Sequence, residues 1–452
     1  MNTYKRLLIT IGFIILILTG CTNNTQMTIS PKFKSGEKIT FFVTNDIHYL
    51  AEGLRDEGEA FQKFFIDGDG KQLNYIDEIL EAFINDIEQK KPEILIISGD
   101  LTNNGEKQSH IELAEKLNKI EEMGISVYVI PGNHDILNPW ALGFKDNKRY
   151  FVDTITDKDF SKIYNNFGYN EAISKDKHTL SYLAAPSEDT WLLMLDTNKY
   201  SDNQKYGQPQ TDGMIKDETF EWIQECSELA KENDAKIITV MHHNLLDHSK
   251  IIRAGFTINN NKEVLEKFSD LGLNLALSGH VHIQDISSYE KISKSNVSEK
   301  FFDIATSSLS VYPQQYGILD YSPELNSYNY STAFVDVEGW SKEKGILDKN
   351  LNEFKKYSYT FFADKGYDMA YKFLKEDKNY DDRQKNLMAE TFKKVNVKYF
   401  EGTDNNTQEI INSEGFKLWE EAKPSFIKSY IMSIYSDEDI DDNNFLIKQV
   451  FH

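Results

Sequence analysis

The sequence predicts an α/β fold followed by a mainly helical C-terminal region. From Ile39 to about Leu277, short apolar runs alternate with amphipathic stretches. Beyond about Lys342, apolar side chains recur every three to four positions instead. The first pattern is typical of a sheet covered by helices, and the second of helices packed together. With 40% hydrophobic residues, the 452-residue chain also has enough apolar side chains for a large core.

The first half of the alternation contains three predicted strands with helices between them. Ile39–Thr44, Ile94–Ser98 and Ile125–Ile130 are short and apolar, and they are rich in residues that favour strands. Apolar residues at helical spacing precede Pro92 and Gly124, and both residue types are common where a helix ends. Each strand is therefore expected to connect to the next through a helix.

The second half continues this pattern and then changes. We predict helices at Lys216–Lys231 and Asn261–Leu271, and strands at Thr190–Leu195, Lys236–Met241 and Leu273–Leu277. After His282 the helical stretches give way to strand-like pieces at Phe301–Ile304, Gly317–Leu319 and Thr332–Val337. This change predicts a more antiparallel closing part of the domain.

The C-terminal region, residues 341–452, is predicted to be helical. Helices are expected at Leu351–Lys375, Arg383–Lys398 and Ser413–Tyr435. Pro424 is expected to kink or divide the last of them, because proline cannot continue the hydrogen bonds of a helix interior.

Two acidic segments, Asp67–Gly70 and Asp437–Asp442, place aspartates in alternation as a calcium loop does. Neither has the residues that such a loop needs at its critical places. These places are taken by Lys71 and Gln72 in the first segment, and by Asp442 and Lys448 in the second. We therefore interpret both segments as solvated loops.

The N-terminus has the features of a bacterial lipoprotein signal. Lys5 and Arg6 precede the apolar run Leu7–Leu18, which is too short for a bilayer span of about 20 residues. The run ends in Leu18-Thr19-Gly20-Cys21, which resembles a lipobox, whereas the alternative is an ordinary signal peptide with an incidental cysteine. We expect residues 1–20 to be the signal peptide and residues 21–38 to be a tether.

Lipid on Cys21, such as palmitate, predicts a protein held at the extracytoplasmic face of the cell membrane. The other cysteine, Cys226, then has no partner within the chain, so no disulfide framework is expected. The oligomeric state cannot be derived from these features.

The chain is strongly acidic, with 50 Lys and Arg against 72 Asp and Glu and a net charge of −22. Removing residues 1–20 takes away Lys5 and Arg6 but no acid, so the net charge becomes −24. This balance excludes nucleic acid polymers and anionic lipid surfaces as main partners, because both require basic residues. A small anionic substrate would require strong local positive charge at its binding site.

Groups of polar residues follow five of the predicted strands. In open α/β sheets, side chains at the carboxyl ends of the strands meet in one crevice. Carboxylate, amide and imidazole groups without thiolates are typical ligands of divalent metals. The five groups are Asp46-Ile47-His48, Gly99-Asp100, Gly132-Asn133-His134-Asp135, His242-His243 and Gly279-His280-Val281-His282.

These blocks, in this order, resemble those of the calcineurin-like metallophosphoesterase superfamily. The resemblance implies a four-layer αββα sandwich, here assigned to residues 39–340, with two bound metals. One metal would be held by Asp46, His48 and His282, and the other by Asn133, His242 and His280. Asp100 would bridge both metals. Family members often have proline after the histidine pair, where this chain has Asn244.

The same resemblance implies roles for the residues after Asn133. Asn133 and His134 would contact the substrate phosphate, and Asp135 would orient the His134 ring. His134 would donate a proton to the leaving group or stabilise its charge. The ligand types accept two divalent ions, with manganese or iron favoured and zinc or cobalt as further possibilities.

The substrate class is less closely defined by these residues. The lipobox, the helical C-terminus and the segments His242–Leu246 and His280–Asp285 resemble lipoprotein class III cyclic-nucleotide phosphodiesterases, which implies hydrolysis of 3′,5′-cyclic nucleotides such as cAMP. Glycerophosphodiesters, nucleotides and phosphomonoesters are alternative substrates. A lipid-anchored protein that binds phosphate without turnover is a more distant alternative. Purine stacking and ordinary packing both remain open for Trp140, Phe144, Tyr312 and Tyr316.

Overall fold

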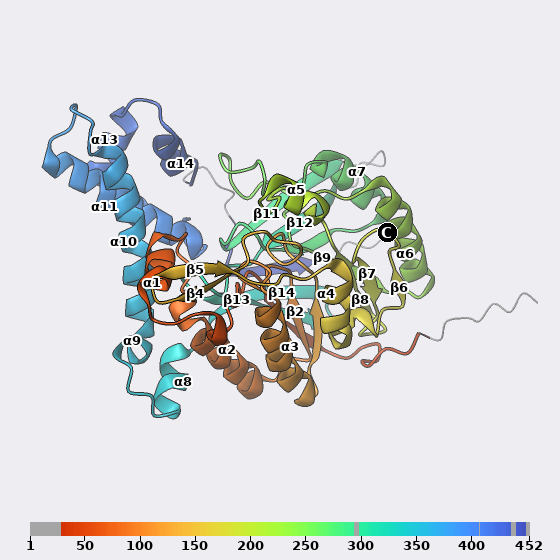
Figure 1. Ribbon diagram of the computed structural model, residues 1–452. Helices are drawn as coiled ribbons and strands as arrows, with labels where there is room; N and C mark the ends of the chain where they lie inside the picture. Colours follow the sequence, from red (N-terminus) through yellow and green to blue (C-terminus); the bar gives the residue numbers. More distant parts are fainter. Residues whose placement is uncertain (1–28, 293–297, 406, 435–439, 449–452) are drawn as a thin grey trace, which may run out of the picture.

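The computed structural model describes residues 29–292, 298–405, 407–434 and 440–448. Among these residues the strands form two large sheets and one two-stranded hairpin (Figure 1). The expected signal peptide, the lipidation site Cys21 and most of the acidic run Asp437–Asp442 lie outside the described residues.

The first sheet has the strand order β15-β14-β13-β1-β2-β3 in the described part of the chain. Strands β1, β2 and β3 run parallel, whereas β13, β14 and β15 are joined antiparallel to the β1 edge. This arrangement confirms the prediction that the part of the domain after His282 is more antiparallel. The bounds are β1 Ile39–Thr44, β2 Ile94–Ile97, β3 Ser126–Val129, β13 Gln315–Ser322, β14 Ser327–Phe334 and β15 Asn444–Lys448.

The second sheet has the order β11-β12-β10-β9-β8-β7-β6 among the described strands, with β8, β9, β10 and β12 parallel. Its bounds are β6 Ser174–Lys175, β7 Tyr182–Ala184, β8 Thr190–Leu195, β9 Lys236–Met241, β10 Leu275–Ser278, β11 Asp285–Ile292 and β12 Ser298–Ala305. The separate hairpin consists of β4 Leu142–Lys145 and β5 Lys148–Phe151.

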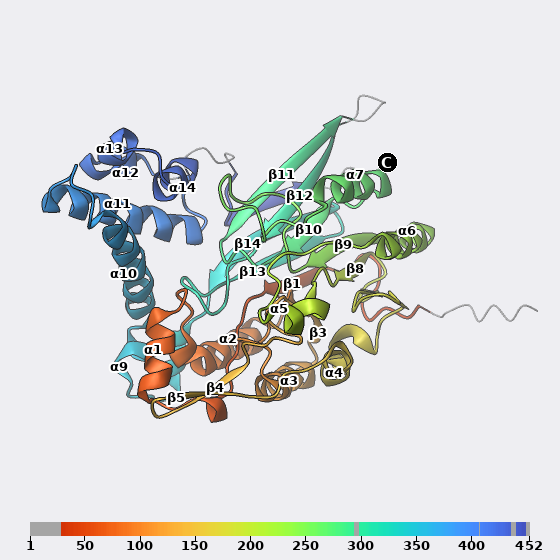
Figure 2. The same cartoon turned by 45° about the horizontal axis from the view of Figure 1, so that its top comes forward.

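Burial along β8 shows how the layers are stacked. Leu192 and Met194 pack with residues of β1 and β2 in the core between the sheets. Their neighbours Leu193 and Leu195 pack with residues of α6 and α7 on the other face. Since successive side chains of a strand point to opposite faces, the order is helix, sheet, sheet, helix, as Figure 2 shows.

Helices cover both outer faces and form the C-terminal region. In the α/β part they are α1 Glu59–Asp67, α2 Ile76–Lys90, α3 Lys107–Glu122, α4 Asp157–Ile163, α5 Asn203–Tyr206, α6 Asp217–Glu232 and α7 Asn261–Leu271. Beyond it lie α8 Val337–Glu343, α9 Lys349–Asn352, α10 Phe354–Leu374, α11 Asp382–Phe400, α12 Gln408–Ile411, α13 Glu414–Glu421 and α14 Phe426–Ile434. Short turns are η1 Glu52–Leu54, η2 Leu73–Tyr75, η3 Asn165–Tyr169 and η4 Tyr200–Asp202.

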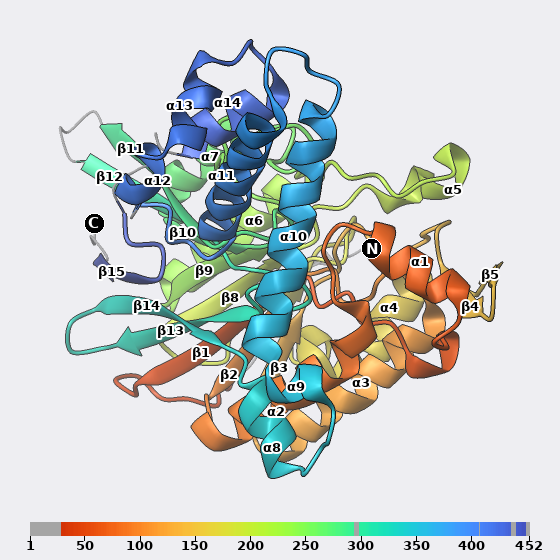
Figure 3. The same ribbon diagram turned by 90° about the vertical axis from the view of Figure 1, so that its left-hand side faces the viewer.

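The C-terminal helices pack around a core that includes Met388, Phe392 and Trp419, and Ile283 of the α/β part belongs to the same core. Figure 3 shows α10 crossing the α/β part, with α8 and α9 at one end and α11 to α14 at the other. The expected division at Pro424 is confirmed, because α13 ends before it and α14 begins after it.

The end of the described chain differs from the expected helical region. Residues Asn444–Lys448 form β15, which pairs with β14 and extends the first sheet. The physical reason is pairing across the sequence: the free edge of β14 offers backbone hydrogen bonds that a local pattern cannot reveal.

No helix among the described residues combines the length and apolarity of a membrane span. Cys226 lies in α6, where it is buried and free. Burial raises the pKa of its thiol to about 12, which makes it a packing residue.

Candidate functional site

The predicted ligands lie at the carboxyl ends of strands from both sheets. Asp46 and His48 follow β1, and Asp100 follows β2. On the other sheet, His242 follows β9 and His280 follows β10. Because parallel strands end at one edge, the two sheets bring these segments together between them.

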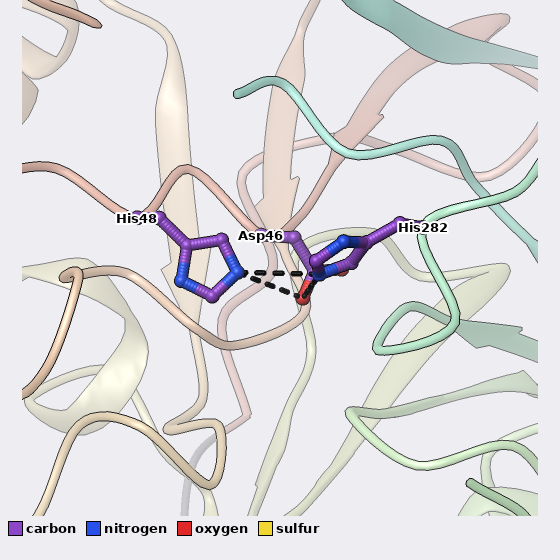
Figure 4. Close-up of side chains that lie close together, drawn as sticks. All are labelled: Asp46, His48 and His282. Carbon is purple, nitrogen blue, oxygen red and sulfur yellow. Dashed lines mark hydrogen bonds and ion pairs between the residues drawn. The ribbon is translucent and has the colours of Figure 1, made fainter. Parts of the chain in front are cut away.

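Asp46, His48 and His282 form the first group of potential ligands. The Nε2 atom of His282 lies 3.2 Å from Oδ1 of Asp46 and 3.2 Å from Nε2 of His48. Figure 4 shows the three side chains converging on one point. Oδ1 of Asp46 is buried and accepts no hydrogen bond among the described residues. A buried oxygen of this kind next to two imidazoles fits a divalent cation.

The second group contains Asp100, His242 and His280, and Asn133 adjoins it. Nδ1 of His242 faces the carbonyl oxygen of Ser98 at 3.0 Å, so this nitrogen carries the proton. The other nitrogen, Nε2, then presents a lone pair to Oδ1 of Asn133 at 3.1 Å. Two lone pairs at this distance repel unless a proton or a cation lies between them, so this group is a candidate metal site.

Asp100 lies between the two groups. Its Oδ1 is 3.5 Å from Nε2 of His242, and its Oδ2 is 3.7 Å from Nε2 of His48. The backbone N–H of His134 donates to Oδ1 and holds the carboxylate in place. Each oxygen thus faces a different set of ligands, as a bridging carboxylate requires.

Backbone oxygens set the orientation of His280. Its Nε2 donates to the carbonyl of Gly255 at 2.8 Å, so Nδ1 carries the lone pair that is free to bind a metal. Its backbone N–H donates to Oδ2 of Asp46, which links the two groups directly. The neighbouring His243 has a different role, because its ring contacts Thr197 and the Thr211 carbonyl.

The electrostatics of the two groups differ. Burial, reinforced by the charge of Lys71, lowers the pKa of His48 far below its usual range. Burial also opposes a charged His242, yet Asp100 raises the pKa of this ring to about 9. For Asp100, burial opposes ionisation, but His242 and His134 hold the pKa of its carboxyl well below the usual range.

The ligand loops have an uncommon backbone conformation. Asp46, His48, Asp100, His280 and His282 all have positive φ, between 48° and 70°. Such angles disfavour residues with a Cβ by roughly 1–2 kcal/mol each. Since five predicted ligands share the feature, packing of the two sheets must enforce it, which is typical of a functional site.

His134 lies beside this centre, with Nε2 3.9 Å from Oδ2 of Asp100. Its Nδ1 donates to the carbonyl oxygen of Asn103 at 2.7 Å and lies 3.1 Å from Oδ1 of Asn104. These contacts leave Nε2 facing Asp100 and the two groups of potential metal ligands. Burial lowers the pKa of the ring, and Asp100 opposes that effect.

The expected contact between Asp135 and the His134 ring is wrong. The Asp135 carboxylate is buried and accepts backbone hydrogen bonds from Leu101, Thr102 and Gly132. It therefore ties the loop after β2 to the loop after β3. The side chain of an adjacent residue points away from the ring here, which a linear motif cannot show, and burial raises the pKa of Asp135 to about 7.

The segment Asp67–Gly70, interpreted as a solvated loop, is exposed from Asp67 to Asp69, whereas the two residues that follow it are not. Lys71 and Gln72 are buried, with 8% and 0% of their surface exposed. The charge of Lys71 acts on both His48 and His134. The sequence analysis did not identify this lysine as a residue of the site. The signal in the sequence was its position directly after the glycine-containing segment Asp67–Gly70.

The four aromatic residues considered for purine stacking differ in their exposure to solvent. Phe144, Tyr312 and Tyr316 are buried in the structure, whereas Trp140 is 47% exposed. Its indole N–H donates to the carbonyl of Gly207. The structure therefore places three of them in packing roles.

Comparisons with known proteins agree with this geometry. Residues 39–284 match the family model of calcineurin-like phosphoesterases, and the chain belongs to this family. Residues 336–441 match the C-terminal domain of cyclic nucleotide phosphodiesterase. The protein is therefore a phosphoester hydrolase of the metallophosphoesterase fold whose ligands support two divalent metals.

One similar solved structure is a dimetal phosphatase from Danio rerio, at 11% identity and a TM-score of 0.45. The match covers 67% of this chain and 96% of that one. The search of curated proteins finds no match.

Proposed function

We propose that the protein is a 3′,5′-cyclic-nucleotide phosphodiesterase. The observation that supports this substrate class is the match of residues 336–441 to the C-terminal domain of cyclic nucleotide phosphodiesterase. That domain follows a metallophosphoesterase domain in the same chain. A complete set of candidate ligands for two metals accompanies it, and the site lies where both sheets end.

The proposed ligand sets are Asp46, His48 and His282 for one metal, and Asn133, His242 and His280 for the other, with Asp100 shared. Two bound cations supply Lewis acidity and a water of lowered pKa. Asp100 sets the spacing of the two sites through its two oxygens. We favour manganese or iron, because the mixed ligands accept either.

His134 is the proposed proton donor to the leaving oxygen. The Asn103 carbonyl holds its Nδ1 and leaves Nε2 facing the metal side. In the proposed reaction, the oxygen of a water molecule bonds to phosphorus and loses its proton to solvent, while the phosphorus–oxygen bond to the leaving alkoxide breaks. Because Nδ1 already donates to the Asn103 carbonyl, His134 acts in its doubly protonated form, and Nε2 gives its proton to the leaving oxygen. Asp135 contributes by holding the loop that carries Asn133 and His134.

The test is product analysis with the purified protein on a panel of substrates. The panel contains 3′,5′-cyclic AMP, a 2′,3′-cyclic nucleotide, a glycerophosphodiester and a nucleoside monophosphate, each with manganese, with iron and with chelator. We expect the highest kcat/KM for the 3′,5′-cyclic nucleotide and loss of turnover with chelator. Preference for a monoester would contradict the proposal, and phosphate binding without turnover would identify a binding protein.

We further propose that lipid on Cys21 anchors the protein to the outer face of the cell membrane. The lipobox-like segment that ends at Cys21 supports this location. Anchoring by lipid fits a chain whose net charge of −22 disfavours binding to an anionic bilayer through its surface. Fractionation of cells that produce the wild type or Cys21→Ser tests it. A variant that stays in the membrane fraction would contradict the proposal.

A further inference from the structure

The segment of residues 66–72, called the Lys71 loop below, contains a buried cation. Lys71 retains 8% exposure, whereas the side chain of its partner Asp69 is 61% exposed, with 3.0 Å between Nζ and Oδ2. Lysine is rarely buried unless its charge meets a partner. Burial opposes ionisation of Asp69, but Lys71, His282 and His134 hold the pKa of its carboxyl well below the usual range, so the ion pair lies beside the centre. An anion that enters the site therefore competes with Asp69 for the lysine.

Hydrogen bonds tie this loop to the first ligand block. The backbone N–H of Gln72 donates to the carbonyl of Ser310 at 2.8 Å. The hydroxyl of Ser310 then donates to the carbonyl of Asp46 at 3.0 Å. Only two hydrogen bonds therefore separate the loop from a predicted metal ligand. The charge of Lys71 also lowers the pKa of two histidines of the centre, His48 and His134, beyond the larger effect of their burial.

Helix α10 of the C-terminal region holds the other side of the loop. The Phe361 ring stacks on Phe65 with centroids 4.7 Å apart, and Lys365 donates to the carbonyl of Gly68 at 3.0 Å. Gln72 donates from Nε2 to the hydroxyl of Ser358 at 2.6 Å. Residues 358, 361 and 365 are spaced three and four apart, so they lie on one face of the helix.

Close packing leaves the loop little freedom. Gly70 has φ of 101°, and a Cβ at this position would lie 3.4 Å from the Phe362 ring of α10. Only glycine adopts this backbone angle without strain. The loop is thus shaped by α10 on one side and joined to Ser310 on the other, and Lys71 lies between these anchors.

We propose that Lys71 binds a non-bridging oxygen of the phosphate ester, and that α10 positions it for this contact. The proposal rests on the phosphodiesterase function proposed above. The acidic chain repels anions in general, and a lysine beside the metals supplies local positive charge where the phosphate lies. The C-terminal domain thereby takes part in substrate binding without a residue of its own in the site.

The test compares Lys71→Met, which removes the charge, with Lys71→Arg, which keeps it. Lys63→Met, on the exposed surface of α1, is the matched control. Binding of inorganic phosphate to the metal-loaded proteins is measured by calorimetry, and metal content is measured in parallel. We expect Lys71→Met to weaken phosphate binding about 10- to 100-fold, with metal content unchanged. Lys71→Arg should retain most of the affinity.

Turnover of bis-p-nitrophenyl phosphate separates this inference from the function on which it rests. If the wild type binds phosphate but cleaves no diester, the phosphodiesterase proposal fails and the Lys71 contact is still measured by calorimetry. Unchanged phosphate affinity in Lys71→Met overturns the Lys71 proposal. Loss of metal in step with loss of affinity also overturns it, because the lysine would then support the metal sites instead.

Discussion

The ligand loops and the Lys71 loop deliver charged side chains to the same centre by different means. Asp46 and His48 follow a central strand, and five predicted ligands have strained backbone angles that both sheets enforce. The Lys71 loop follows α1 and is held by a helix almost 300 residues later in the chain. The metal centre is therefore built into the sheets, whereas the lysine depends on the C-terminal domain.

Because of this difference, we expect substitutions in the two regions to affect metal binding and substrate binding separately. Changes at the carboxyl ends of the strands should remove metal, because ligands and their hydrogen bonds are shared between loops. Changes on α10 should leave the metals in place and affect the substrate. The following predictions test this separation.

The largest effect is expected for Asp100→Ala. Each oxygen of Asp100 faces a different ligand group, so both metals lose a ligand and several kcal/mol of charge stabilisation. We expect turnover to fall by at least about 10³-fold, with metal content reduced for both sites when measured by mass spectrometry. Asp270→Ala, a change at an exposed residue, is the control. Full retention of both metals would contradict the bridging role.

His134→Ala should keep both metals and lower kcat by about 10²-fold, the range of a general acid. Since Nε2 is proposed to protonate the leaving oxygen, the loss should be larger for an alkyl leaving group than for p-nitrophenol. By contrast, Lys71→Met should lose the same factor with both. His178→Ala, at an exposed histidine, serves as the control. An equal loss for both leaving groups would exclude the proton-donor role.

His248 provides a test of how the C-terminal domain is attached. Its buried ring lies between Asp285 and Asp303, and its carbonyl accepts from the Tyr399 hydroxyl of α11 at 2.6 Å. Burial opposes a charged ring, but the two carboxylates raise the pKa of His248 to about 10. A raised pKa stabilises the fold below the ordinary value near 6.5, and this contribution is lost as pH rises towards 10.

The free energy of unfolding should therefore fall by about 4 kcal/mol between pH 6.5 and 10 through this group. Denaturant unfolding of the wild type and His248→Gln at several pH values measures it, because glutamine does not titrate. The variant should show a flatter profile over this window, and His178→Gln should follow the wild type. Parallel profiles for wild type and His248→Gln would show that the ring is not charged in the fold.

The smallest effect is expected for Lys365→Met, which removes the donor to the carbonyls of Ile66 and Gly68. Loosening the Lys71 loop should lower kcat/KM by about fivefold, mostly through KM, because about 1 kcal/mol is typical of one hydrogen bond. Metal content should not change. Lys365→Arg should restore activity, and Lys372→Met, exposed on the same helix, should have no effect. A fall in metal content would contradict the separation between the two regions.

Much of the fold followed from local pattern. The bounds of β1, β8, β9 and α7 agree with the predicted segments, because a short apolar run or a helical repeat is decided by neighbouring residues. The strand β15 was not predicted within the region expected to be mainly helical, since pairing with β14 depends on an edge that lies more than 100 residues earlier. Local pattern does not contain such a partner.

The residues of the candidate site were also predicted in large part from the sequence. The seven proposed ligands came from the resemblance of the five motif blocks to those of metallophosphoesterases, and the structure brings them together at the ends of both sheets. The direction of the Asp135 side chain and the burial of Lys71 were not predicted. Both depend on which backbone groups face a side chain after folding, and spacing along the chain carries no information about that.

The sequence alone indicated the class of the protein, because its five blocks resemble in order those of metallophosphoesterases, and the rule that parallel strands end together places them in one crevice. Tertiary structure decided the rest: the left-handed backbone of the ligand loops, the tie between two loops through Asp135, and the contact of α10 with the Lys71 loop. The physical reason is the distance along the sequence over which the stabilising contacts are made. A strand or helix is stabilised mainly by residues near it in sequence, whereas a buried charge is placed by whichever segments pack around it.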